Sequence, residues 1–307
     1  MSRSGLALRL ATTAPRAASL GVRVWAESYI RRPRRQHWLF AKLKTDLRLR
    51  LKKPARLFTG QRVCVDPFDI VGGAIARDGC YEPETVAVFQ QLLSPGAVAV
   101  DAGAHVGQYT LLAALAVAEP GHVHAFEPDP TTFELLAGNV RRNRCRNVTA
   151  NRAALGHDTC SGTLYYADVF NTGGNSLRPD TTTAGAYVTV AVCTLDAYAV
   201  AQRLARLDVL KADVEGAELP LLDGARATIA RFAPTMILEF SVKTALFGYS
   251  RADLRQALAR AGYSLFRIGR MPLRSDGACG VHADFVNMLA VHRSKQAALV
   301  SRGVVEA

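Results

Sequence analysis

The sequence predicts an α/β fold in which helices cover both faces of a mostly parallel sheet. Short apolar runs alternate along the chain with longer segments of helical character. Several of these runs are apolar at every position, as expected for parallel strands that are buried on both faces. A turn with two glycines follows one run and an acidic residue ends the next, which is typical of a nucleotide-binding βαβ unit.

The individual elements follow from the apolar runs and from the residues that flank them. The expected strands are 97–101, 122–126, 147–151, 207–212, 235–240, 263–268 and 284–291. The expected helices are 83–93, 107–118, 130–143, 217–231 and 250–261. Pro130 fits the first turn of its helix, where a missing N–H costs little. Ser250 and Asp253 have the spacing of a capping box at the last helix, and Gly262 fits its end.

The segment 156–194 interrupts this alternation. It contains several glycines, and its β-rich pieces at 163–166 and 187–193 predict a β-hairpin above the carboxyl ends of the sheet. Insertions of this kind often bind substrate or cover a site, and a plain surface loop is the equal alternative. The residues in it that suit a polar acceptor are Asn171, Asn175 and Ser176.

The glycine turn of the βαβ unit runs from Asp101 to Gly107, and Glu127 ends the second strand. Glycines let the backbone approach a ligand, and an acid at the strand end accepts hydrogen bonds from two ribose hydroxyls. A dinucleotide site needs G-x-G-x-x-G, but Asp101 and Val106 replace the first and third glycines. The spacing D-x-G-x-x-x-G instead resembles motif I of S-adenosylmethionine methyltransferases. That ligand has no phosphate, and its ammonium group suits a carboxylate such as Asp101. The alternative is that the glycines serve packing only.

Further motifs along the chain extend this resemblance. They are Gly79–Thr85, Glu127–Pro130, Asn151–Gly156, Asn175–Leu177, Thr194–Asp196 and Leu207–Glu218. In this order they resemble the FkbM family of S-adenosylmethionine-dependent methyltransferases over residues 75–270, and the most specific part is Lys211–Glu218. The resemblance implies a Rossmann-like class I methyltransferase fold, with a seven-stranded sheet whose last strand is antiparallel. It also implies a largely bacterial family that methylates hydroxyl oxygens of sugars or polyketide-type natural products.

The resemblance, together with the βαβ pattern, predicts a binding site for S-adenosyl-L-methionine. We expect Glu127 to hold the ribose, Ala153 and Ala154 to make room for the adenine, and Tyr81 and Glu82 to close over the methionine end. His105 stands where many methyltransferases have glycine, and it either touches the cofactor or fills space. The expected cofactor-binding residues are Tyr81, Glu82, Asp101, Gly103, Ala104, His105, Gly107, Glu127, Pro128, Ala153 and Ala154.

Acidic residues gather at the ends of the fourth and fifth expected strands. Alternation along the fourth strand places Lys211, Asp213 and Glu215 on one side, and Glu239 arrives from the fifth. An alcohol acceptor must lose a proton, and carboxylates that lie close together raise one another's pKa, so one of them can act as a base. Asp213 is the first candidate for this role and Glu215 the second, while Lys211 would hold these anions or an acceptor oxygen.

The same carboxylates also allow other interpretations. Lys211 and Glu215 would form a salt bridge, and Glu218 would cap the helix that follows. The carboxylates of Asp213, Glu215, Glu218 and Glu239 suit Mg²⁺, which takes oxygen ligands, but we do not expect a required metal. Two other functions remain as alternatives. The missing glycine motif counts against an NAD(P)-dependent oxidoreductase, and the intact set of acids counts against a non-catalytic glycan-recognition module.

Composition and charge divide the 307 residues unevenly. Residues 1–62 hold 16 of the 38 Lys and Arg and two acidic residues, so their net charge is +14. The other 245 residues hold 22 basic and 24 acidic side chains, which gives −2 and accounts for the total of +12. We therefore expect a basic N-terminal extension (1–62, partly helical or disordered), a methyltransferase domain (63–295) and a C-terminal tail (296–307). The near-neutral domain does not predict binding to nucleic acid.

The six cysteines form no C-x-x-C pair and predict reduced thiols, as expected of a cytoplasmic enzyme. Arg9, Arg16 and Arg23 interrupt every apolar core that a secretory signal would need. The basic extension resembles an organelle transit peptide, or it lies as a solvated helix, or its amphipathic stretch 38–53 contacts an anionic membrane. The last interpretation predicts peripheral contact through residues 1–55 at the inner membrane face. It favours a lipid-linked glycan over a soluble small-molecule acceptor.

Overall fold

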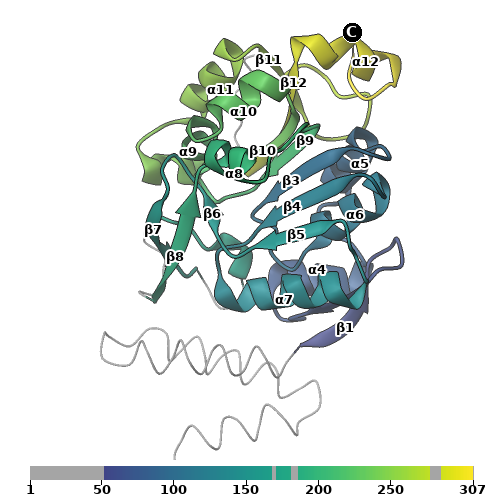
Figure 1. The fold of residues 1–307 in the computed structure, drawn as a ribbon, viewed down its shortest axis with the longest axis vertical. Helices are drawn as coiled ribbons and strands as arrows, with labels where there is room; N and C mark the ends of the chain where they lie inside the picture. The colour runs from purple at the N-terminus through teal and green to yellow at the C-terminus, as the bar shows by residue number, and fades with distance from the viewer. Residues whose placement is uncertain (1–51, 168–170, 181–185, 277–284, 307) are drawn as a thin grey trace, which may run out of the picture.

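A seven-stranded sheet runs through the centre of the protein (Figure 1). The computed structural model describes residues 52–167, 171–180, 186–276 and 285–306. In spatial order the strands are β11 (Tyr263–Arg267), β12 (Phe285–His292), β10 (Thr235–Ser241), β9 (Val209–Ala212), β3 (Val98–Ala102), β4 (His122–Phe126) and β5 (Val148–Asn151). Only β12 is antiparallel to its neighbours, β10 and β11. The seven predicted strands and the antiparallel last strand are therefore confirmed.

Helices pack against both faces of this sheet, as predicted. One face is covered by α5 (Pro83–Leu92), α6 (Gln108–Val117) and α7 (Pro130–Arg142), and the other by α8 (Leu195–Ala201), α9 (Glu218–Asp223), α10 (Arg226–Phe232) and α11 (Arg251–Arg260). Neighbouring strand residues such as Ala99 and Val100 belong to opposite cores, and both are at most 1% exposed. This is why the strands are apolar at every position.

Helix ends follow the predicted capping residues. Asp129 accepts hydrogen bonds from the backbone at the start of α7, and Pro130 occupies its first turn. Ser250 and Asp253 form the complete capping box of α11, because each side chain accepts from the backbone N–H of the other residue. Gly262 follows α11 with a φ of +86°, a conformation that glycine adopts without strain.

The predicted helix 217–231 is broken at Gly224 into α9 and α10. A Cβ at Gly224 would lie 2.0 Å from the carbonyl oxygen of Gly156, so the helix backbone touches the start of the insertion. Asp196 also accepts hydrogen bonds from the N–H groups of Ala227 and Thr228, at 2.9 and 2.7 Å, and so caps α10. The break is therefore caused by contacts with residues far away in the sequence.

The insertion forms a β-hairpin, as expected. It consists of β7 (Cys160–Tyr165) and β8 (Tyr187–Cys193), which are antiparallel, and the short β6 (Ala154–Leu155) pairs with β8. A single turn of 3₁₀-helix, η1 (Thr172–Gly174), lies between the two long strands in the sequence. Figure 1 shows this small sheet at the side of the central one.

The folded body extends beyond the expected limits of 63 and 295. Strands β1 (Lys53–Arg56) and β2 (Arg62–Val65) form a hairpin before α4 (Ile70–Asp78), and the side chain of Asn139 in α7 bonds both backbone groups of Cys64. At the other end α12 (Arg293–Ser301) is followed by the buried Val304 and Val305. Most of the expected basic extension, residues 1–51, lies outside the described residues.

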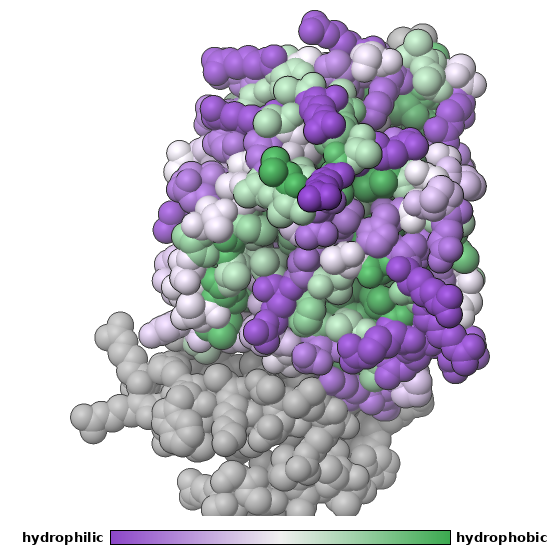
Figure 2. All heavy atoms as spheres, viewed as in Figure 1, coloured by the Kyte–Doolittle hydropathy of each residue, from purple (hydrophilic) through white to green (hydrophobic). Residues whose placement is uncertain are grey.

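The face shown in Figure 2 carries mainly hydrophilic side chains with small apolar areas between them. Among the described residues, no helix has both the length and the apolar character needed to cross a membrane. The described cysteines are free thiols, at positions Cys64, Cys80, Cys145, Cys160 and Cys193. Cys279 lies outside the described residues.

Candidate active site

A cavity of about 420 Å³ lies where β3, β4, β9 and β10 end, and the insertion forms part of its wall. Open α/β sheets bind their ligands at this edge. Of the predicted site residues, those that line the cavity are Tyr81, Glu82, Gly103, Ala104, His105, Glu127, Pro128, Ala154, Lys211, Asp213, Glu215 and Glu239. The sheet therefore brings the expected cofactor end and the expected catalytic end into one space.

Three predicted residues lie away from the cavity lining. Asp101 is inside β3 and fully buried, and its Oδ2 accepts a 2.6 Å hydrogen bond from the Thr110 hydroxyl. Asp101 is therefore not part of the cavity lining, and its expected contact with the ammonium group of the cofactor stays a prediction. Gly107 has a φ of +93°, and a Cβ there would lie 2.8 Å from Leu136, so its role is in the turn and in packing. Ala153 packs against the core.

Gly103 joins the two halves of the site. Its φ is +76°, and a Cβ there would lie 1.9 Å from the carbonyl oxygen of Asp213. Any side chain would push the loop after β3 away from the loop after β9. The glycine is therefore required for the close approach of the two loops, as well as for its backbone conformation.

Glu127 ends β4 and presents a carboxylate to the cavity. Its Oε2 accepts the backbone N–H of His105 at 2.9 Å, and its Oε1 accepts that of Asp129 at 2.8 Å. Each oxygen keeps a further lone pair, so the group can accept two more hydrogen bonds, such as those of a ribose diol. Burial, and then the charge of Asp129, raise the pKa of Glu127 to about 8.

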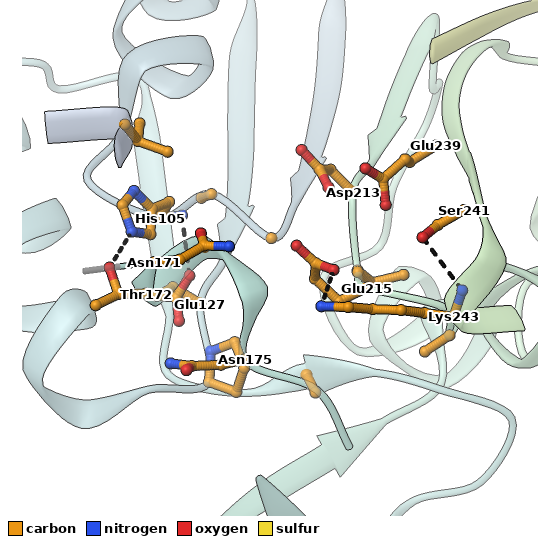
Figure 3. A pocket seen from close by; sticks show the side chains of 18 of the residues that line it. His105, Glu127, Asn171, Thr172, Asn175, Asp213, Glu215, Glu239, Ser241 and Lys243 are labelled. Atoms are coloured by element: carbon orange, nitrogen blue, oxygen red, sulfur yellow. Dashed lines mark hydrogen bonds and ion pairs between the residues drawn. The ribbon is translucent and has the colours of Figure 1, made fainter. Parts of the chain in front are cut away.

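His105 connects the loop after β3 to the insertion (Figure 3). Its Nε2 lies 2.8 Å from the hydroxyl of Thr172, and that hydroxyl donates a 2.7 Å hydrogen bond to Asp69, the N-cap of α4. Because the single hydroxyl proton goes to Asp69, His105 Nε2 is the donor to Thr172. Burial raises the pKa of Asp69, but His105 and Thr172 outweigh it and lower this pKa overall. Neither Asp69 nor Thr172 was identified from the sequence.

The insertion contributes two of its three candidate residues to the cavity. Asn171 and Asn175 line it, whereas the Ser176 hydroxyl donates a hydrogen bond to the backbone oxygen of Glu215 at 2.8 Å. The segment therefore forms part of the site wall as well as supporting the loop after β9.

Lys211 in β9 is almost fully buried and pairs with Asp213, with 3.2 Å between Nζ and Oδ2. Its ammonium group also lies 4.4 Å from the ring centroid of Tyr109. The salt bridge between Lys211 and Glu215, given above as an alternative, does not form, because Glu215 pairs with Lys243 at 2.6 Å (Figure 3). The strand ends at Ala212, so the alternation that the prediction assumed does not reach residue 215.

Glu239 in β10 completes an acidic cluster with Asp213 and Glu215. Each of the three residues offers a carboxylate oxygen, and these oxygens lie within 4.8 Å of one another. Burial, and then the charge of Asp213, raise the pKa of Glu239 well above its ordinary value. Burial also raises the pKa of Glu215 to about 7, against the opposing effect of Lys243.

Glu218 does not belong to this cluster. It is fully buried, and its Oε1 accepts the backbone N–H groups of Val214 and Gly216 at 3.2 and 3.4 Å. Both N–H groups precede α9, so these bonds hold the loop before the helix and, contrary to the alternative interpretation, do not cap the helix itself.

Three of the seven described non-glycine residues with positive φ line the cavity. Glu82, His105 and Glu215 have φ values of +52°, +49° and +55°, a region that side-chain-bearing residues rarely adopt, and all three line the cavity. The segment with Tyr81 is held over the site by Gln108, whose side-chain amide bonds both backbone groups of Tyr81 at 2.7 and 2.8 Å.

The chain is similar to known methyltransferases. The pattern of the family described as "Methyltransferase FkbM domain" matches residues 101–265, which is more than half of the chain. Among solved structures, the methyltransferase FkbM from Methylobacillus flagellatus KT is 15% identical, with a TM-score of 0.42, and the match covers 86% of this chain and 57% of that one. This chain thus spans little more than half the length of that protein.

Two further solved structures are similar over comparable lengths. The precorrin-6y C5,15-methyltransferase from Geobacter metallireducens GS-15 is 15% identical with a TM-score of 0.40, and the match covers 70% of this chain and 90% of that one. An S-adenosylmethionine-dependent O-methyltransferase from Thermotoga maritima is 12% identical with a TM-score of 0.40, covering 78% and 77%. No curated protein sequence matches the chain.

Proposed function

Because this chain belongs to the FkbM methyltransferase family, we propose that it transfers a methyl group from S-adenosylmethionine to a hydroxyl oxygen of a sugar, glycolipid or polyketide-type acceptor. One observation carries this proposal. A carboxylate suited to a ribose, Glu127, and the acidic cluster of Asp213, Glu215 and Glu239 line the same cavity. Its volume of about 420 Å³ lies within the range of small-molecule sites.

The residues present fit S-adenosylmethionine better than a dinucleotide. Glu127 has two lone pairs left for a ribose diol, and Gly103 leaves its loop without a side chain at the cavity wall. A pyrophosphate needs free cationic or N–H donors. Among the described residues that line the cavity, the lysines are Lys211 and Lys243, and each is already paired with a carboxylate.

The acceptor side of the cavity offers a base. When bound, the cofactor supplies a methyl group that is activated by a positively charged sulfur. An acceptor hydroxyl beside the cluster would pass its proton to the carboxylate of Asp213, whose side chain is 27% exposed and so remains accessible. The ammonium group of Lys211, which is buried in β9, holds the Asp213 carboxylate in place through their ion pair.

We also propose that the acceptor is borne by a membrane lipid and that residues 1–55 bring the enzyme to the inner membrane face. The support is the net charge of +14 on residues 1–62, against −2 on the remainder. Clusters of Lys and Arg bind anionic lipid surfaces. Co-sedimentation with anionic liposomes, with the full chain and with a chain that lacks residues 1–51 but keeps β1, tests this part, and equal binding by both forms would overturn it.

Calorimetry with S-adenosylhomocysteine and with NAD tests the donor. We expect binding of the former only, and tight binding of NAD alone would instead favour an NAD(P)-dependent oxidoreductase. Comparison of lipids and glycans from cells with and without the gene then identifies the acceptor as the species that lacks one methyl mass. An Asp213→Asn variant should still bind S-adenosylhomocysteine but should not restore the methylated species to cells that lack the gene. If the lipid and glycan profiles are unchanged, the acceptor is a soluble small molecule.

A further inference from the structure

The geometry points to a binding site for a hard divalent cation between Asp213, Glu215 and Glu239. This inference rests on the proposed function, because it concerns the acceptor side of the same cavity. It also goes beyond the sequence, from which a required metal was not expected.

The three carboxylates are placed as ligands of one ion. They come from β10 and from the loop after β9, and their oxygens lie within 4.8 Å of one another. Two oxygen ligands on opposite sides of one ion are separated by about 4.8 Å for Ca²⁺ and by about 4.2 Å for Mg²⁺. Three oxygens would fill half of an octahedral shell and leave the other positions open to the cavity for water or acceptor hydroxyls.

Glu239 provides a second, independent observation. It is only 9% exposed, and within the described part of the chain its Oε2 has no hydrogen-bond partner. Figure 3 shows its carboxylate directed at Asp213 and toward Glu215. Buried polar atoms are nearly always satisfied, and an unsatisfied one commonly marks the place of an ion or water.

The lysines of the cavity leave room for a further cation. Lys211 bonds Oδ2 of Asp213 and Lys243 bonds Oε2 of Glu215, and among the described residues no Lys or Arg pairs with Glu239. Of the described residues that line the cavity, six are acidic and two are lysines, the acidic ones being Glu82, Glu127, Asp180, Asp213, Glu215 and Glu239. A doubly charged ion bound by Asp213, Glu215 and Glu239 would offset this excess of acidic side chains where they lie closest together.

Titration of the full-length chain with Mn²⁺ tests the site. The protein is first stripped with EDTA and desalted, and free Mn²⁺ is followed by electron paramagnetic resonance without cofactor or acceptor. We expect one Mn²⁺ per chain, displaced by Mg²⁺ or Ca²⁺. Glu239→Gln should weaken binding at least tenfold, whereas the same change at the exposed Glu84 should leave it unaltered.

Absence of Mn²⁺ binding, or equal binding by wild type and Glu239→Gln, would overturn the inference. Circular dichroism and thermal unfolding check that the variant is folded, and if it is not, Asp213→Asn provides the same comparison. Calorimetry with S-adenosylhomocysteine in EDTA separates this inference from the proposed function. Donor binding without Mn²⁺ binding would refute the cation site alone, and Mn²⁺ binding without donor binding would refute the proposed donor alone.

Discussion

Substitution of Glu127 by Gln should weaken donor binding strongly while the protein stays folded. Both oxygens of Glu127 already accept a backbone N–H, from His105 at 2.9 Å and from Asp129 at 2.8 Å. Glutamine replaces one of these acceptors by an NH₂ group. One backbone N–H then loses its acceptor, and one ribose hydroxyl meets a donor in place of a carboxylate oxygen.

The size of the effect follows from the hydrogen bonds that are lost. A hydrogen bond to a charged group contributes about 1.5–3 kcal/mol. Since about 1.4 kcal/mol corresponds to a factor of ten, the dissociation constant for S-adenosylhomocysteine should rise about 10-fold to 100-fold. The unsatisfied backbone donor should in addition cost about 1–3 kcal/mol of stability in the free protein.

Isothermal titration calorimetry with S-adenosylhomocysteine measures the affinity, and urea unfolding of the free protein measures the stability. Glu134→Gln is the matched control, because Glu134 is exposed on α7 and the chemical change is identical. Should Glu127→Gln bind the ligand as tightly as the control does, the assignment of the ribose site to this carboxylate would be refuted.

Three further predictions concern Gly103, Glu127 and His124. Gly103→Ala should destabilise the protein by about 2 kcal/mol more than Gly96→Ala in urea unfolding. Both glycines have a positive φ, but only at Gly103 would the added Cβ collide with a backbone atom. Equal losses of stability would contradict this prediction. The pKa of Glu127 lies near 8 in the free protein, and hydrogen bonds from the ribose favour the ionised form of this carboxyl group. Donor binding at pH 7 should therefore release close to one proton. The binding enthalpy should then vary with the ionisation enthalpy of the buffer. Burial lowers the pKa of His124 to about 4 in the folded protein, whereas in the unfolded chain this histidine takes up a proton below about pH 6.5. The unfolded state therefore binds more protons between these two values, and the free energy of unfolding should decrease as the pH falls from 6.5 to 4. His124→Gln should lessen that fall in urea unfolding, and the same change at the exposed His157 should not.

The sequence predicted the sheet well because its signal is local. Each central strand is buried on both faces, so it appears as an apolar run whatever its partners are. Capping residues are local in the same sense, and Ser250 and Asp253 lie within one turn of each other. The break at Gly224 was missed because its cause is the backbone of Gly156, which no pattern within the helix reveals.

The candidate site was predicted in composition but not in its pairings. Strand ends identified Lys211, Asp213 and Glu239, since the carboxyl ends of parallel strands meet at one edge. The partner of Glu215 could not be identified, because Lys243 follows a different strand, 28 residues further along the chain. The strained backbone of Glu215 likewise depends on the surrounding fold, and a non-glycine residue gives no warning of it.

The contact between β3 and β9 determines when during folding the site can form. These neighbouring strands join parts of the chain far apart in sequence, and the hydrogen bond from Val98 to Asp208 spans 110 residues. Glu127 lies on one side of this junction and Asp213 on the other. During synthesis the first half therefore emerges with the edge of β3 unpaired and waits for β9, an arrangement that slows folding and exposes the chain to aggregation. The early half alone contains Glu127 but none of Asp213, Glu215 and Glu239, so a truncated chain would lack one side of the cavity and would expose the edge of β3 to chaperones.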